Sequence, residues 1–289
     1  MSLPLVTPNE TGGLAGNICC VTTWVCKACG TQYPPSEEPP GACSICEDPR
    51  QYVPFGEGQV WLSWEEFLAD HRAEIRDDEG IIGIGCEPGF AIGQRALLVE
   101  SPAGNLLWDC ITYLDDAIVE RIAAEGGLAG IAISHPHYYT AMVEWAHAFD
   151  CPVWLHEADR RWVMRLDPRV RFWRGETKEL GGGVTLIRCG GHFEGGQVLH
   201  WAQRRALLSG DIVQVIPDRR YVSFMYSYPN LIPLPLSKVQ AIARALEPYA
   251  FDAIYGAWWG RIVPRDGSAV VRRSAERYVQ AVTDPAFTR

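Results

Sequence analysis

The stretch IAISHPHYYTAMVEWAHAFD, residues 131–150, decides how the rest of the chain is interpreted. It begins as a buried strand, continues into His135-Pro136-His137, and then follows a helical pattern over 141–149. Two histidines at i and i+2 of a regular strand would point to opposite faces of the sheet. Pro136 favours a bend between them, so both imidazoles can face one metal ion once the chain has left the strand.

Two further candidate ligands also lie at the ends of strands. His192 lies in the glycine-flanked loop CGGHFEGG, residues 189–196, and Asp211 ends the strand ALLSGD, residues 206–211. Three imidazoles and one carboxylate at strand ends are typical of an open metal site of the hydrolytic kind. Separate surface histidines are the alternative interpretation, because spacing alone does not show that the side chains converge.

The segments around these motifs alternate between strand and helix patterns, and a turn-rich stretch at 101–104 indicates a hairpin. This mixture indicates an α/β architecture built on two mixed sheets. The expected strands are 80–90, 93–104, 104–111, 128–134, 151–156, 184–191, 196–201, 205–211 and 251–259. The expected helices are 114–126, 141–149, 157–166, 237–249 and 268–282.

A second metal motif lies near the N-terminus. CKACGTQYPPSEEPPGACSICE, residues 26–47, contains two C-x-x-C pairs with 13 residues between them. Two such pairs can complete a tetrahedral zinc cage of four thiolates, with a rubredoxin-type iron site as the alternative. A closed cage has no open coordination position, so its expected role is to hold this segment folded. Docking of a protein partner is a further role. The expected ligands are Cys26, Cys29, Cys43 and Cys46.

We expect three segments. The middle one should contain a helix over about 64–76 that begins at a capping box formed by Ser63 and Glu66. The expected boundaries are 1–60 for the zinc-ribbon module, 61–79 for the linker helix and 80–289 for the main domain.

The composition limits the classes of partner. The formal net charge of −9 argues against a nucleic-acid partner, and the chain has no apolar run long enough to span a bilayer. The first residues lack the basic start and apolar segment of a signal peptide. We therefore expect a soluble cytoplasmic protein with reduced thiols. The six scattered cysteines should be small buried apolar residues: Cys19, Cys20, Cys86, Cys110, Cys151 and Cys189.

In their order and spacing, these motifs resemble the metallo-β-lactamase fold superfamily over roughly residues 80–285. The resemblance implies a four-layer αβ/βα sandwich, here with a small N-terminal zinc ribbon, and a site along the edge where the two sheets meet. It runs through ALLVESPAGNLLWDC, AISHPHYYTAMVEWAHAF, CPVWLHEAD, GGHFEGGQVLHW, LLSGD and FDAIYGAWWG.

The resemblance also implies which residues belong to the first metal site. The family motif H-x-H-x-D-H falls on residues 135–140 and keeps His135 and His137. His192 matches the family's distal histidine and Asp211 its bridging aspartate. Asp109 matches a carboxylate that supports the metal-binding loop from below.

The residues specific to the second metal are replaced. Tyr139 and Thr140 stand at the family's Asp and His, and its terminal histidine falls at Ala257 or Trp258, neither of which can ligate. We therefore predict one zinc or iron ion, held by the three histidines, with Asp211 as fourth ligand or as partner to bound water.

The predicted function is hydrolysis of a small ester, thioester or amide. Asp211, Tyr139 and Glu194 are the predicted catalytic residues, and Tyr138 is an alternative to the last two for orienting substrate or handling protons. Packed aromatic rings that replace lost ligands are the other interpretation of both tyrosines. A catalytically silent binding protein, with the zinc ribbon docking a protein partner, is the alternative function. The sequence does not indicate an oligomeric state.

Overall fold

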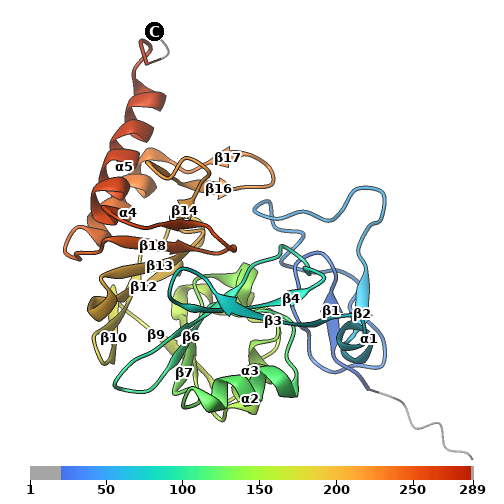
Figure 1. Cartoon of the computed structure of the whole chain (residues 1–289). Coiled ribbons are helices and arrows are strands. Elements are labelled where there is room, and N and C mark those ends of the chain that lie inside the picture. The colour runs from blue at the N-terminus through green and yellow to red at the C-terminus, as the bar shows by residue number, and fades with distance from the viewer. Residues whose placement is uncertain (1–20, 288–289) are drawn as a thin grey trace, which may run out of the picture.

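The computed structural model describes residues 21–287 (Figure 1). Cys19, Cys20 and the first residues of the chain, which carry the expectation about a signal peptide, lie outside these residues. Two large mixed sheets form the centre of the molecule. Helices α2 and α3 lie on one side of them and α4 and α5 on the other, and the N-terminal module lies at one flank.

The first large sheet has seven strands in the order β3-β4-β5-β6-β7-β8-β9. The pairs from β3 to β6 are antiparallel, and those from β6 to β9 are parallel. Its strands are Arg72–Asp77, Ile82–Glu87, Ala96–Val99, Leu106–Trp108, Gly130–Ala132, Val153–His156 and Val170–Trp173. Helix α2 (Asp116–Ala124) connects β6 to β7, and α3 (Met142–Ala148) connects β7 to β8.

The second large sheet has six strands in the order β10-β11-β12-β13-β18-β19. Its strands are Thr177–Gly181, Val184–Arg188, Gln197–Trp201, Ala206–Gly210, Ala253–Gly256 and Ile262–Val263. Helices α4 (Leu236–Leu246) and α5 (Gly267–Thr283) pack on it. Two small hairpins lie between β13 and α4: β14 (Gln214–Val215) with β15 (Val222–Ser223), and β16 (Met225–Ser227) with β17 (Ile232–Pro233). Short 3₁₀ segments are Pro136–Tyr138, Glu157–Trp162 and Ala202–Arg204.

Three apolar clusters define the layers. One lies between the sheets and joins Leu97 of β5 to Leu208 of β13. A second packs the other face of the seven-stranded sheet, including Leu98, against α2 and α3. A third packs the six-stranded sheet against α4 and α5. Leu97 and Leu98 belong to different clusters because neighbouring strand residues point to opposite faces. The predicted αβ/βα sandwich is confirmed.

The N-terminal module is a ribbon of β1 (Trp24–Cys26) and β2 (Trp61–Ser63), followed by α1 (Trp64–Ala69). The capping box of Ser63 and Glu66 is present as predicted. The predicted extent of this helix, to about residue 76, is wrong, because Arg72–Asp77 forms β3 at the edge of the main sheet. Alternate residues Ala73 and Ile75 pack on the core, which is the period of a strand.

Two further differences concern the segment between β8 and β11. The helix predicted over 157–166 is a 3₁₀ segment of Glu157–Trp162. Strands β9 and β10 follow it and were not predicted, because they are short and take their conformation from the neighbouring strands. Of the described scattered cysteines, Cys86 is half-buried and Cys110, Cys151 and Cys189 are buried.

Candidate metal centres

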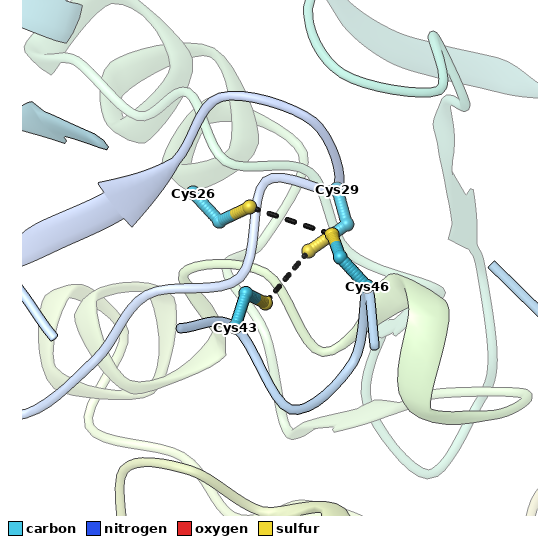
Figure 2. Close-up of side chains that lie close together, drawn as sticks. All are labelled: Cys26, Cys29, Cys43 and Cys46. Carbon is cyan, nitrogen blue, oxygen red and sulfur yellow. Dashed lines mark hydrogen bonds between the residues drawn. The ribbon is translucent and has the colours of Figure 1, made fainter. Parts of the chain in front are cut away.

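The four ribbon cysteines form a compact sulfur cage (Figure 2). Cys26 Sγ lies 3.6 Å from Cys46 Sγ, and Cys29 Sγ lies 3.6 Å from Cys43 Sγ. A tetrahedral zinc site with Zn–S distances of about 2.3 Å places its sulfurs about 3.8 Å apart, so the cage has the size zinc needs. Gly30 follows the first knuckle with φ of +78°, a conformation that glycine adopts without strain.

The second centre brings together the side chains of His135, His137, His192 and Asp211. Their candidate ligand atoms all lie within 4.8 Å of one another. His135 Nε2 is 3.2 Å from Asp211 Oδ1, and His137 Nδ1 is 3.2 Å from His192 Nε2. The 3₁₀ turn that starts at Pro136 carries the chain out of the strand direction, which lets both histidines of the motif face this point.

This donor set fits a divalent cation. All four side chains are buried, and within residues 21–287 His135 Nε2 and Asp211 Oδ1, which lie 3.2 Å from each other, have no other polar partner. Burial lowers the pKa values of His135 and His137 and lowers that of His192 to about 4, so the imidazoles are neutral and can donate lone pairs. Burial, together with the charge of Asp109, raises the pKa of Asp211 to about 8. A cation beside the Asp211 carboxylate would stabilise its charged form, and so offset the burial and the Asp109 charge that raise its pKa.

Hydrogen bonds hold the imidazoles in place. The Ser134 hydroxyl lies 2.9 Å from His135 Nδ1, and Met225 O lies 3.2 Å from His192 Nδ1. With Nδ1 of His192 donating to this carbonyl, Nε2 keeps the lone pair that a metal requires. Asp109, buried below the loop, accepts the Ser134 backbone N–H at 2.7 Å. This contact has the geometry that the resemblance implies for a supporting carboxylate.

Gly210 lets the loop that carries Asp211 approach this support closely. A Cβ on Gly210 would lie 2.5 Å from Ser134 Oγ, and φ at this position is +55°. A side chain there would push the Asp211 loop away from the histidine motif.

Neither a carboxylate nor an imidazole stands at the positions to which the resemblance assigns second-metal ligands. Tyr138, which precedes two of these positions, lies against His135 with ring centroids 4.4 Å apart. Tyr139 is buried in the core cluster beside α3, and Ala257 is buried in the same cluster. The backbone carbonyl of Thr140 accepts the backbone N–H of Gln32 from the ribbon at 3.1 Å. Trp258 donates from Nε1 to Ile92 O at 2.8 Å.

The three predicted catalytic residues lie in different surroundings. Asp211 belongs to the metal centre, Tyr139 is buried, and Glu194 is exposed with its backbone carbonyl accepting a bond from Arg188 Nε. Tyr138 lies against the candidate ligand His135, with ring centroids 4.4 Å apart. Burial, followed by the charges of Asp211 and Asp109, raises its pKa well above the ordinary value. The catalytic roles of Tyr139 and Glu194 stay predictions.

Sequence reasoning missed two residues of this centre, Arg50 and Phe193. The Phe193 ring lies 5.0 to 5.5 Å from all three imidazoles, and the Arg50 guanidinium lies 3.7 Å from the Phe193 centroid. The position of Phe193 directly after His192 was a weak indication that it lies near the centre. No local sequence pattern indicates a role for Arg50, because its contact with the centre depends on how the ribbon packs on the main domain.

No protein-family model matches the chain. It is 44% identical over 271 residues to the uncharacterized protein YmaE of Bacillus subtilis (strain 168), which covers 91% of this chain and 98% of YmaE. The chain belongs to the YmaE family.

Solved structures establish the fold of the main domain. The metallo-β-lactamase DIM-1 superposes with a TM-score of 0.56 at 17% identity, over 73% of this chain and 98% of that one. FIM-1 from Pseudomonas aeruginosa, in a mono-zinc form, superposes with a TM-score of 0.51 at 14% identity, over 71% and 96%. This member of the YmaE family therefore has the metallo-β-lactamase fold. Within residues 21–287, no helix combines the length and the apolar character needed to cross a bilayer.

Proposed function

We propose that the chain is a metal-dependent hydrolase with one metal ion in its main domain, acting on a small ester, thioester or amide. The observation that carries this proposal is the convergence of three neutral imidazoles and one carboxylate, buried together and lacking other partners for His135 Nε2 and Asp211 Oδ1 among the described residues. Zinc is the first expectation for such a set and iron the alternative. FIM-1 is an example of this fold in a mono-zinc form.

A divalent ion at this centre would polarise a carbonyl oxygen and lower the pKa of a water molecule. The chain's own groups would handle the protons. Asp211 lies within the donor set, so its carboxylate could hold the ion or accept a proton from the water molecule. Burial keeps the Tyr138 hydroxyl protonated beside His135, so it can donate a hydrogen bond to an oxyanion. The same buried surroundings restrict the reacting group to a small one.

The test combines metal content with hydrolysis. Purified protein should be assayed against esters, thioesters, amides and a β-lactam, with and without chelator. We expect a chelator-sensitive activity that His192→Ala removes. His147→Ala is the matched control, because this histidine pairs with Asp167 at the surface, outside the centre. Activity that survives both the chelator and His192→Ala would overturn the proposal.

A silent binding protein is the second candidate, and two observations favour it. The ligand side chains are buried as in a closed site. The ribbon also exposes Tyr52, Val53 and Phe55 in one loop, with Phe55 fully accessible, which would suit a protein partner. Two bound ions without hydrolysis of any substrate in the panel would favour this role.

A further inference from the structure

Residues 48–51 of the ribbon lie directly against the metal centre of the main domain. Arg50 donates from a terminal nitrogen to the backbone carbonyl of His192 at 3.2 Å. Asn230, next to β17, donates from Nδ2 to Pro49 O at 3.0 Å and to Gln51 O at 3.1 Å. This four-residue segment, which we call the strap, is therefore tied to the main domain on both sides of Arg50.

The Arg50 side chain is held in one orientation. It is 6% exposed and forms a bidentate pair with Asp48, with Nε to Oδ1 at 2.6 Å and a terminal nitrogen to Oδ2 at 2.8 Å. Its guanidinium lies 3.7 Å from the centroid of Phe193, the ring that contacts all three imidazoles. Asp48 balances the charge of the Arg50 guanidinium and occupies two of its nitrogens. Arg50 is therefore suited to hold neighbouring groups in place rather than to bind a substrate anion.

The strap is also tied to the sulfur cage. It begins two residues after the ligand Cys46, and the backbone N–H of Glu47 donates to Cys43 O at 3.0 Å inside the second knuckle. The backbone N–H of Gln51 donates to Asp48 O at 2.9 Å, which closes the turn that presents Arg50. A metal ion that organises the second knuckle thus also organises this turn.

We propose that Arg50 is a positioning residue through which the four-cysteine ribbon holds His192 in its ligating orientation, so that loading of the cage raises the metal affinity of the main-domain site. The inference rests on the metal site of the proposed function but not on hydrolysis. Groups that orient metal ligands without touching the ion typically change metal affinity by about 10- to 100-fold. Because coupling between two binding sites is reciprocal, an ion in the main site should raise the affinity of the cage by the same factor.

The experiment is a titration of the full metal-free chain with Co²⁺ alone, followed by absorption spectroscopy. Thiolate charge-transfer bands report the cage, and the ligand-field bands of a nitrogen and oxygen site report the main centre. Arg50→Lys keeps the positive charge but loses the planar guanidinium that bonds Asp48 and His192 at the same time. We expect main-site Co²⁺ affinity to fall by about tenfold or more and its ligand-field bands to shift, with the cage still binding its ion.

Arg160→Lys is the matched control. Arg160 also forms a bidentate pair with an acid, Glu157, and lies 3.7 Å from the centroid of an aromatic ring, Phe172, but it does not contact the metal centre. This variant should leave both affinities unchanged. Asn230→Ala removes the two hydrogen bonds that hold the strap and leaves Arg50 unchanged. It should also lower the Co²⁺ affinity of the main site, and it replaces Arg50→Lys as the test variant if that variant does not fold.

The outcomes separate this inference from the proposed function. Equal main-site affinity in wild type, Arg50→Lys and Asn230→Ala would overturn the coupling and leave the hydrolase proposal standing. An equal loss of main-site Co²⁺ affinity in Arg50→Lys and Arg160→Lys would also overturn the coupling, because replacing any paired arginine would then have the same effect. Absence of a main-site ion in the wild-type chain would overturn both.

Discussion

Replacing Gly30 by alanine tests how rigidly the ribbon is docked on the main domain. Gly30 has φ of +78°, and a Cβ there would lie 2.4 Å from Thr112 Oγ1 and 3.3 Å from Ala91 Cβ. The left-handed backbone costs a non-glycine residue about 1–2 kcal/mol, and the steric overlap adds about 1–3 kcal/mol. Gly30→Ala should therefore reduce the free energy of unfolding by about 2–5 kcal/mol, a large part of a typical domain's stability.

A double-mutant cycle with Thr112→Ala isolates the docking contribution. Thr112 Oγ1 donates to Gly30 O at 3.0 Å, so removing this hydroxyl deletes the hydrogen bond and the closer of the two contacts that the new Cβ would make. In the Thr112→Ala background, Gly30→Ala should cost mainly the backbone part, about 1–2 kcal/mol. Unfolding by urea at a fixed zinc concentration measures all four proteins. An identical cost of Gly30→Ala in both backgrounds would refute the close docking of the knuckle on Thr112.

Three further predictions concern the metal centres. The chain should bind about two divalent ions after dialysis, and His192→Ala should lose one while the cage keeps the other, as measured by elemental analysis. An unchanged metal content in His192→Ala would contradict this. Because a proton on Asp211, whose pKa is about 8, must leave when a cation binds, main-site affinity should rise by about tenfold per pH unit up to about pH 8. Calorimetric titration at several pH values checks this, and Asp211→Asn should remove that rise. Asp109→Ala should cost about 1–3 kcal/mol in urea unfolding, because it leaves the buried Ser134 N–H without its acceptor, whereas Asp109→Asn keeps an acceptor and should cost less.

Part of the fold was accessible from local patterns. The helices α2, α3, α4 and α5 and most strands of the two sheets follow from hydrophobic period and turn residues, which act over a few neighbouring positions. The helix predicted over about 64–76 was too long, because Arg72–Asp77 alternates apolar and polar residues only weakly and pairing with β4 decides that it is a strand. Strands β9 and β10 were missed because their conformation depends on a neighbouring strand rather than on their own composition.

The sequence by itself determined the chemical identity of both donor sets, because cysteine pairs and histidines at strand ends are recognisable from residue type and spacing. Only the tertiary structure decided what surrounds these donors. Arg50 and His192 are 142 positions apart, and the bond between them exists because the ribbon packs beside the edge where the sheets meet. Tyr138, not Tyr139, lies against His135 for a similar reason: the 3₁₀ turn rotates successive residues to different sides. Such contacts depend on how distant segments pack, which no local pattern encodes.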